Sequence, residues 1–343
     1  MESRRTTAGQ LIGQSLLAWF RKAPRDLPWR RTRDPYRIWV SEIMLQQTRT
    51  QAVIPYYQRF IERYPTLGSL ARAREEEVLA LWAGLGYYSR ARNLWRAARQ
   101  VAAAGRFPDE IAELRCLPGI GDYTAAAIAS IAFGRPHAVV DGNVLRVVAR
   151  VLNSGADIGA AATRRRFAET AQGWLVRRDP GGFNQALMEL GATICLPRNP
   201  LCDACPISAH CQARRAGTAA QLPVKLRRAE PVEVRATLLV VERAGKVLLR
   251  RRAASHRQLA GFWDLPSPGE LPGARVGALV GEFRHSITRH RYRIRVARAE
   301  ARKPTAPPGT FAWMDTRRLE NVPLSTIARK ALNLAGQHIR PNR

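Results

Sequence analysis

The sequence predicts an all-α domain followed by a smaller α/β domain, and three observations support this. Apolar residues recur with helical spacing through residues 10–215. Residues 216–230 are polar and basic without periodicity, as is typical of a linker. Residues 234–241, 247–250 and 292–296 favour strands, the last with strict alternation. We therefore expect a helical domain over residues 1–217, a linker over 218–230 and an α/β domain over 231–343.

The composition points to a polyanionic partner. The chain of 343 residues carries 56 basic and 27 acidic side chains, for a net charge of +29. A protein this basic most often binds nucleic acid, although 51 of the basic residues are arginine and a solvated arginine-rich surface is the plainer alternative. No apolar run approaches about eighteen residues, and the N-terminus lacks a signal-peptide pattern. We expect a cytoplasmic, nucleoid-associated protein that does not contact a membrane.

The helical region shows regular apolar faces and clear breaks. One face collects Leu11, Ile12, Leu16, Leu17 and Phe20, and another collects Val53, Tyr56, Tyr57, Phe60 and Ile61. Proline, glycine and aspartate mark breaks at residues 24–28, 65, 84–86, 108–109, 134–136 and 179–182. A final helix is expected over residues 326–336.

A tight turn lies at the centre of this region, in residues 114–124. Gly119 and Gly121 flank one apolar residue, and a run of good helix formers follows at residues 125–132. Such a turn leaves backbone N–H groups free at a helix start, where they can bind a phosphate. A short Gly-x-Gly turn is more often only structural. Cys116, just before it, is expected to be a packed core thiol.

Four of the five cysteines fall within residues 195–211. Cys195, Cys202, Cys205 and Cys211 have the spacing C-x6-C-x2-C-x5-C. This clustering indicates metal ligation in a reducing compartment rather than a disulfide framework. Four thiolates on a loop bind either tetrahedral zinc or an iron–sulfur cube, and spacing alone does not decide between them.

Together, the Gly-x-Gly hairpin, the aspartate at position 141 and the cysteine spacing resemble the helix-hairpin-helix DNA glycosylases of the endonuclease III superfamily. The resemblance covers essentially the whole helical domain. It implies a helix-hairpin-helix fold in which Cys195, Cys202, Cys205 and Cys211 hold a [4Fe–4S] cluster.

Two longer motifs, residues 41–48 and 84–92, resemble the MutY family of adenine DNA glycosylases within that superfamily. Bifunctional relatives carry a lysine where this chain has Tyr123. Independently of any family, no lysine occurs between Lys22 and Lys225, so the helical interior offers no amine for an imine with a sugar aldehyde. A lyase that uses an internal lysine is excluded, whereas a monofunctional glycosylase is not.

Two carboxylates are candidates for the chemistry. Glu42 lies between apolar neighbours on its helix, which should raise its pKa toward that of a proton donor, although a surface glutamate is an equal alternative. Asp141 precedes a helix that begins near Asn143, where the helix dipole favours an ionised carboxylate, although a simple N-cap is the alternative. The resemblance implies that Glu42 protonates N7 of adenine and helps to activate water. It also implies that Asp141 stabilises or captures the sugar cation, while Asn143 and Tyr123 position the sugar and the acid.

An adenine in a duplex must be extruded before it can be cleaved. The resemblance places Trp29, Arg30, Leu45 and Gln185 around the extruded base, and Gln47, Leu85 and Tyr87 on the DNA, with Gln47 and Tyr87 wedged into the gap. Trp29 and Leu45 could instead be core, and Tyr87 a packed aromatic. The N–H groups at Gly119 and Gly121 would bind the phosphate 3′ to the lesion.

Residues 261–266 and the strands around them resemble Nudix-type domains. Between Leu265 and His285 there are only two acids, Glu270 and Glu282, so a metal-dependent diphosphate hydrolase is not expected. The resemblance implies a domain that recognises 8-oxoguanine opposite the adenine. The family's Phe-Ser-His turn is altered here, and the candidate contacts are Ser286, Thr288 and His290.

The sequence therefore predicts a monomeric adenine glycosylase that acts on A·8-oxoguanine or A·G mispairs in double-stranded DNA. It should leave an abasic site without cutting the strand. One rival is an endonuclease III-like enzyme for oxidised pyrimidines, which Tyr123 and the second domain disfavour. Another is a silent DNA-binding protein, which retention of Glu42 and Asp141 disfavours.

Overall fold

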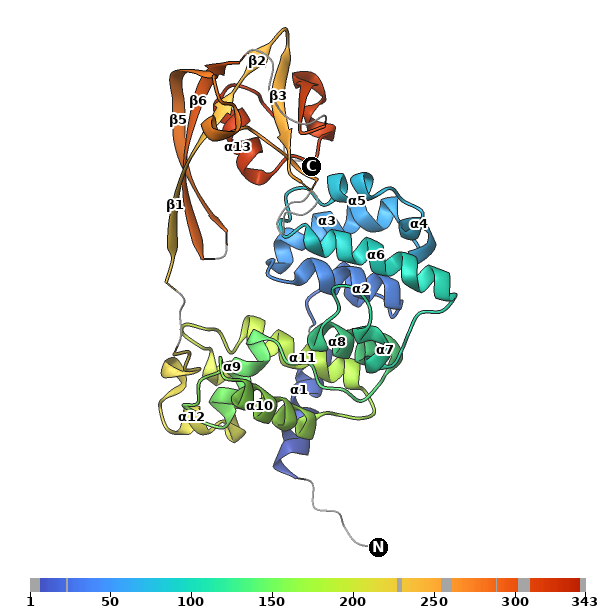
Figure 1. Cartoon of the computed structure of the whole chain (residues 1–343). Coiled ribbons are helices and arrows are strands. Elements are labelled where there is room, and N and C mark those ends of the chain that lie inside the picture. The colour runs from blue at the N-terminus through green and yellow to red at the C-terminus, as the bar shows by residue number, and fades with distance from the viewer. Residues whose placement is uncertain are drawn as a thin grey trace, which may run out of the picture. The chain divides into compact units, whose positions relative to one another are not determined.

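The computed structural model describes residues 7–22, 24–226, 230–253, 261–287, 289–301 and 309–339 (Figure 1). The α-helices are α1 (Ala8–Lys22), α2 (Pro35–Leu45), α3 (Thr50–Arg63), α4 (Leu67–Ala71), α5 (Glu75–Leu81), α6 (Ser89–Ala104), α7 (Ile111–Arg115), α8 (Asp122–Phe133), α9 (Gly142–Val151), α10 (Ala161–Trp174), α11 (Pro180–Thr193), α12 (Gln212–Arg215) and α13 (Thr326–Leu334). The strands are β1 (Val232–Val240), β2 (Glu242–Arg243), β3 (Lys246–Arg251), β4 (Trp263–Asp264), β5 (Arg275–Ile287), β6 (His290–Glu300) and β7 (Phe311–Asp315). No helix in these described ranges is long and apolar enough to cross a bilayer.

The chain divides into two compact units. The first comprises residues 1–71 and 96–228, and the second comprises residues 72–95 and 229–343. Residues 72–95 are helical but belong to the second unit, where the ring of Tyr88 lies 4.1 Å from the ring of Phe262 between centroids. The α-then-α/β order expected from the sequence is observed.

Helix α11 lies at the centre of the first unit and packs against α1, α8 and α9. It can approach α8 closely because residue 181 is glycine: a Cβ there would lie 2.8 Å from Cα of Ile131. Asp179 caps the helix, since its carboxylate accepts a hydrogen bond from the backbone N–H of Gly182 at 3.0 Å. The expected break at residues 179–182 is therefore a helix start, and both glycines lie inside α11.

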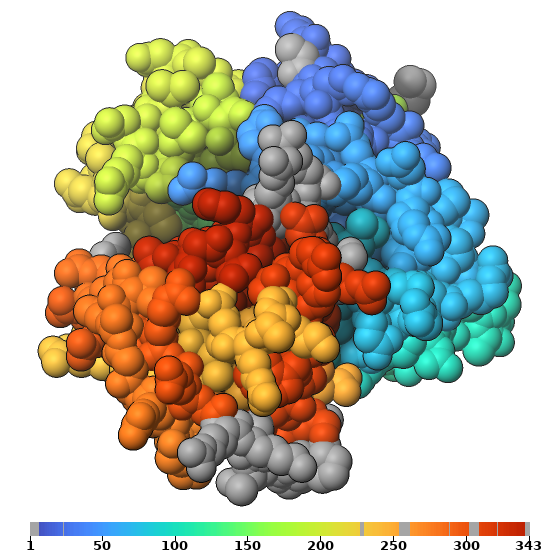
Figure 2. Space-filling view, turned by 90° about the horizontal axis from the view of Figure 1, so that it is seen from above, coloured from blue at the N-terminus to red at the C-terminus, as the bar shows by residue number. Residues whose placement is uncertain are grey.

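Two sheets form most of the second unit. In the first, β6 lies between β1, which is parallel to it, and β5, which is antiparallel. In the second, β3 pairs with β2, β4 and β7. Helix α13 packs with an apolar core over one face of these strands, and the space-filling view shows the orange strands beside the red C-terminal segment (Figure 2).

Several expectations need correction. Strand β5 was not expected, because two register shifts and two glycines interrupt its alternation. Residues 218–226 are not a free linker: the N–H of Ile158 bonds to the carbonyl of Val224 at 3.0 Å, which ties this segment to the helical unit. Leu11 is 40% exposed instead of packed on its helix face. Cys116 is exposed rather than a core thiol, because α7 turns it outward before the hairpin.

Candidate active site

A cavity of about 190 Å³ in the helical unit collects most of the predicted catalytic and base-binding residues. Its walls come from the short 3-10 helix Pro28–Arg30, from α2, α8 and α11, and from the start of α9. Eight residues singled out from the sequence line it, namely Trp29, Arg30, Glu42, Leu45, Tyr123, Asp141, Asn143 and Gln185. The two carboxylates therefore share one site although they lie about a hundred residues apart.

Glu42 is a buried acid on the inner face of α2. It is 5% exposed, and its Oε2 accepts a hydrogen bond from the hydroxyl of Tyr123 at 2.8 Å. Burial raises the pKa of Glu42 to about 7; the Tyr123 hydrogen bond and the charge of Arg30 lower it, and the charge of Asp141 raises it. A carboxyl with this pKa holds its proton in a large share of molecules at neutral pH, as a general acid requires.

Tyr123 holds the acid in place from the first turn of α8. Burial raises its pKa well above its ordinary value, so the phenol stays protonated and donates to Glu42. The same hydroxyl lies 3.3 Å from Sδ of Met188. One residue along, Thr124 Oγ1 accepts a hydrogen bond from Nε2 of Gln46 at 3.2 Å, which fastens α8 to the end of α2.

Asp141 is the N-cap of α9. Its Oδ1 accepts a hydrogen bond from the backbone N–H of Val144 at 2.7 Å, and its Oδ2 accepts one from Nδ2 of Asn143 at 2.9 Å. Burial raises the pKa of Asp141 above its ordinary value, against the lowering effect of these hydrogen bonds and of the charge of Arg146. Capping and a catalytic role are thus compatible, because the half-buried carboxylate also lines the cavity.

Asn143 connects Asp141 to the cysteine-bearing loop through Arg146. The Nη2 of Arg146 donates to Oδ1 of Asn143 at 2.9 Å and to the carbonyl of Gly191 at 2.7 Å, and its Nε donates to the carbonyl of Cys195 at 2.8 Å. Gly191 allows this approach, since a Cβ there would lie 2.6 Å from Cβ of Asn143. The sequence reasoning missed Arg146, although its position one turn after Asn143 on α9 was a usable signal.

A buried ion cluster forms another wall of the cavity and was also missed. Glu189 is 4% exposed; Arg25 binds both of its carboxylate oxygens, and Nη2 of Arg30 donates to Oε2 at 2.7 Å. Burial raises the pKa of Glu189, but the hydrogen bonds from the two arginines outweigh it, so the net shift is downward and the carboxylate is anionic. The spacing of Glu189, four residues after Gln185 on α11, would have placed both on one helix face.

The aromatic and aliphatic base-pocket candidates have dual roles. Trp29 is 7% exposed and makes an edge contact with Tyr57 at 5.3 Å between ring centroids, so it belongs to the core and also lines the cavity. Leu45, the last residue of α2, and Gln185 are half-buried at the cavity wall. The core and pocket interpretations were therefore not exclusive.

The Gly-x-Gly hairpin has the geometry expected for phosphate binding. Gly119 has φ +81°, a left-handed conformation that favours glycine, and Gly121 begins α8 without any side-chain cap. The first N–H groups of α8 consequently remain available to an anion, as helix N-termini commonly are. Between the exposed glycines, Ile120 is buried and anchors the turn.

The predicted wedge residues lie outside the cavity, on two turns. Gln47 has φ +56° and is exposed directly after α2. Tyr87 has φ +49° and is 40% exposed, in a turn whose carbonyls at Leu85 and Gly86 accept hydrogen bonds from Nη2 of Arg90 at 3.3 and 3.1 Å. Leu85 is buried beneath this turn. Gln47 and Tyr87 both have a left-handed backbone conformation, which is rare for residues other than glycine and fixes the direction of their side chains.

The lesion-recognition candidates occupy the β5–β6 hairpin of the second unit. Ser286 is exposed and pairs with Arg291, whereas His290 is half-buried and pairs with Ile287. Because successive strand residues point to opposite faces, Ser286 and His290 lie on opposite faces of the hairpin. Thr288 lies outside the described residues.

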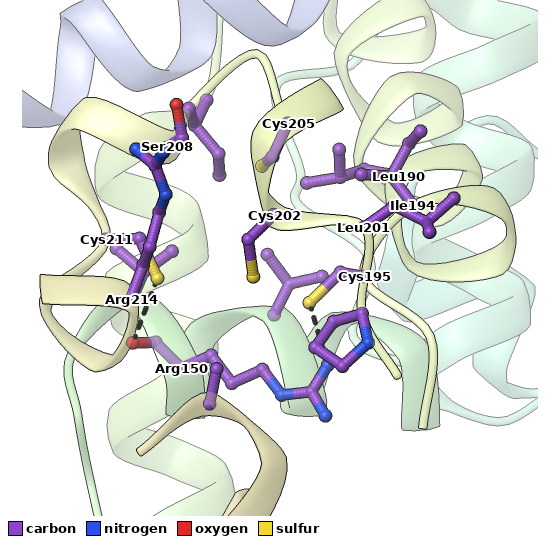
Figure 3. Close-up of a pocket in the computed structure, with 15 residues that line it drawn as sticks. Arg150, Leu190, Ile194, Cys195, Leu201, Cys202, Cys205, Ser208, Cys211 and Arg214 are labelled. Atoms are coloured by element: carbon purple, nitrogen blue, oxygen red, sulfur yellow. Dashed lines mark hydrogen bonds between the residues drawn. The ribbon is translucent and has the colours of Figure 1, made fainter. Parts of the chain in front are cut away.

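The four clustered cysteines line one cavity beside α9 (Figure 3). Within the described part of the chain, no three His, Cys, Asp or Glu side chains converge tightly enough for a single metal ion. All four thiols border this one cavity, so a cluster ligated by four thiolates can be held there. Cys195, Cys202, Cys205 and Cys211 are all half-buried, and none of them is in a disulfide.

Arg150 provides a second sign that this cavity holds an anionic group. Its side chain is 1% exposed, and its Nη1 donates to the carbonyl of Leu196 at 2.6 Å. The same nitrogen donates to Sγ of Cys195 at 3.3 Å (Figure 3). No carboxylate pairs with it among the described residues. A buried guanidinium needs a nearby negative charge, which a cluster ligated by four thiolates supplies.

Comparisons with known proteins agree with this geometry. A family model described as the HhH-GPD superfamily base excision DNA repair protein matches residues 40–172. A second, the iron-sulfur binding domain of endonuclease III, matches residues 195–211. The first match spans Glu42, the hairpin and Asp141, and the second spans all four cysteines.

Full-length relatives extend the match to the second unit. The chain is 36% identical to the adenine DNA glycosylase of Homo sapiens, over 93% of this chain and 73% of that protein. It is 36% identical to that of Mus musculus, over 94% of this chain and 78% of that protein. Among solved structures, a thermostable thymine-DNA glycosylase matches 61% of this chain and 97% of that one, at 31% identity and a TM-score of 0.56. An endonuclease III–DNA complex has a similar fold, with a TM-score of 0.51 at 23% identity, over 61% of this chain and 97% of that one.

The fold, the paired carboxylates and the cysteine loop define a helix-hairpin-helix DNA glycosylase of base excision repair, with a C-terminal Nudix-like α/β domain. The loop holds a [4Fe–4S] cluster, as expected from the resemblance. Since relatives match more than nine tenths of its length, the chain belongs to the adenine DNA glycosylase family. The predicted family, fold class and cofactor are confirmed.

Proposed function

We propose that this protein hydrolyses the N-glycosidic bond of adenine mispaired with 8-oxoguanine or guanine in double-stranded DNA. The observation that carries the proposal is the cavity in which Glu42, with a pKa of about 7, shares space with Asp141. One carboxyl can protonate the leaving base, and the other, whose carboxylate form accepts hydrogen bonds from Val144 and Asn143, can stabilise the sugar cation, as glycoside hydrolysis requires.

In this mechanism Glu42 donates its proton to N7 of the extruded adenine, and the C1′–N9 bond breaks to give a cation-like sugar. Asp141 stabilises the cation or captures it, and water then adds at C1′ with Glu42 as the base. Tyr123 orients Glu42, and Asn143 orients Asp141. The anionic Glu189, held by Arg25 and Arg30, adds a hydrogen-bond acceptor to the base pocket.

Base extrusion is assigned to residues around the cavity and on the two exposed turns. Trp29, Arg30, Leu45 and Gln185 would surround the base, while the exposed Gln47 and Tyr87 would contact the vacated duplex and the buried Leu85 would support the turn that carries Tyr87. The N–H groups at Gly119 and Gly121 would bind the phosphate 3′ to the lesion, because α8 starts there without a cap.

We propose that the enzyme is monofunctional. No lysine lines the cavity, and the position that supplies the amine in bifunctional relatives is Tyr123. Borohydride should trap no covalent complex with wild-type protein, and Tyr123→Lys is the single change expected to produce one. A trapped wild-type complex would contradict the assignment.

Residues 231–343 are proposed as the lesion-recognition domain, with the boundary in the 218–230 segment. Ser286, Thr288 and His290 on the β5–β6 hairpin are the proposed contacts with 8-oxoguanine. The protein would act as a monomer on nucleoid DNA in the cytoplasm.

The test is single-turnover release of adenine from A·8-oxoguanine, A·G and A·T duplexes under identical conditions. We expect the fastest release from A·8-oxoguanine, slower release from A·G and none from A·T. Equal rates for the first two would remove the assigned lesion preference. Release of another base in place of adenine would overturn the proposed substrate.

A further inference from the structure

The solvent face of the β1–β6–β5 sheet carries a cluster of five arginines: Arg235, Arg284, Arg291, Arg293 and Arg295, here called the arginine face. All five are exposed. The opposite face of the same strands is apolar and packs into the core with α13. The arginine face is therefore an outer surface whose side chains are not needed for packing.

Strand register places three of these arginines side by side. Arg235 on β1 pairs with Arg293 on β6, and Arg293 pairs with Arg284 on β5. Like charges directly opposite each other on a sheet destabilise it. The row of three positive charges across three strands therefore does not serve the stability of the sheet, and such a feature is expected at a functional site.

Acids on this face neutralise its charge only in part. Oε1 of Glu233 lies 3.7 Å from Nη1 of Arg291. Glu282 forms an ion pair with Arg293. Arg235, Arg284 and Arg295 have no ion-pair partner among the described residues. Five arginines against two glutamates leave the face with a net charge of +3.

The face is also hollowed. Register shifts in β5 between Val276 and Gly281 open a groove of about 500 Å³ beside Arg235, Arg293 and Arg295. The apolar Leu279, 53% exposed, lies in the same groove. A concave, positively charged surface of this kind concentrates an anionic ligand.

We propose that the arginine face binds the phosphate backbone of duplex DNA, outside the catalytic cavity and next to the proposed lesion contact Ser286, which pairs with Arg291 and points to the same face. Arg291, Arg293 and Arg295 alternate along β6, so they span about 13 Å at ~3.3 Å per residue. The row across the strands extends the charged area in the second direction. The charged area is larger than one phosphate group and is wide enough to contact several phosphates of a nucleic-acid backbone. Guanidinium groups bind such phosphates in a bidentate manner.

This inference goes beyond the proposed excision chemistry and does not depend on which mispair is cleaved. Its test uses the full chain and an undamaged duplex, so that it can succeed or fail separately from lesion recognition. The variant is Arg235→Gln/Arg284→Gln/Arg295→Gln, which removes the three unpaired arginines and leaves no carboxylate without a partner.

Binding is measured by fluorescence anisotropy across salt concentrations from about 50 to 200 mM. Each lost phosphate contact reduces the slope of log affinity against log salt by about 0.9 in magnitude. The slope of the triple variant should therefore be smaller by up to about 2.7, and its affinity at low salt should be roughly tenfold or more weaker. The matched control is Arg243→Gln/Arg275→Gln/Arg318→Gln, which removes the same charge from β2, the start of β5 and the segment after β7 and, like the face variant, breaks no ion pair among the described residues. It should keep most of the slope.

A second measurement does not depend on DNA. Because the row of like charges destabilises the sheet, the face variant should melt at a higher temperature than the control variant. Replacement of the same three arginines by lysine should restore most of the salt slope. Equal slopes for face and control variants would overturn the proposal, as would a face variant that melts lower and still binds DNA normally.

Discussion

The catalytic cavity and the arginine face use arginine in opposite ways. Arg30 lines the cavity and Arg146 lies behind Asn143; both are largely buried, and carboxylate, amide or carbonyl oxygens accept their hydrogen bonds. On the arginine face, Arg235 and Arg284 are exposed and have no acidic partner. Buried guanidinium groups fix the positions of catalytic groups, whereas exposed and unpaired ones remain free to bind phosphates. Substitutions in the first region should change rates, and substitutions in the second should change affinity and its salt dependence.

The largest expected effect is that of Glu42→Gln. The amide cannot donate the proton that the leaving base requires, so the single-turnover rate should fall by about 10³-fold or more while duplex binding stays near normal. The rate is measured with A·8-oxoguanine duplex under protein excess, and binding by anisotropy. Substantial residual turnover would mean that another group supplies the proton.

Gly191→Ala tests the packing around the second carboxylate. A Cβ at this position would lie 2.6 Å from Cβ of Asn143, so Asn143 and Asp141 must shift, and a rate loss of roughly 10²-fold is expected. Gly173→Ala is the matched control, since nothing lies within 4 Å of the Cβ it would add within α10. Similar rates for the two alanine variants would show that the position of Asn143 does not limit catalysis.

A smaller rate change, with a distinct pH signature, is expected for Tyr123→Phe. The wild-type rate should decline as pH rises through about 7, because Glu42 must be protonated. The Tyr123 hydrogen bond lowers the pKa of Glu42, so its loss should move that decline to higher pH. The full pH profile of the single-turnover rate is the measurement. An unshifted pH profile would show that the Tyr123 hydrogen bond does not set the pKa of Glu42.

The last expected effect is on stability and not on rate. The pKa of Glu42 is raised on folding, so its protonated form favours the fold, and that contribution is lost as pH rises from about 4.5 through 7. A shift of this size corresponds to roughly 3 kcal/mol. Glu42→Gln should therefore gain stability relative to wild type as pH rises through this range, as followed by thermal melting. A constant difference across the range would contradict the buried-acid assignment.

The sequence supplied those parts of the site that rest on local patterns. The apolar neighbours of Glu42 predicted a raised pKa, and the Gly-x-Gly turn predicted a helix directly after it, which the structure begins at Asp122. Long-range partners were not predictable, because nothing local to Glu189 shows that Arg25 and Arg30 converge on it from more than 150 residues away.

The second unit was harder to predict for a related reason. Strand β5 depends on its partner β6 across irregular register, and its own sequence lacks the alternation that identified β6. The arginine face follows from pairing between three strands. It was therefore invisible as a cluster, although the net charge of +29 had already indicated that such a surface exists.

Helix α9 carries Asp141 at its N-terminus and, along its length, Arg146 and Arg150, which bind the cysteine loop at Cys195 and Leu196. The ten residues of α9 form a stiff helix about 15 Å long. If the loop is displaced, the whole helix tilts, because it does not bend locally. Substitutions in the cysteine loop that displace Cys195 or Leu196 should consequently lower the catalytic rate. Through α9, the cysteine loop and the position of the Asp141 carboxylate depend on each other.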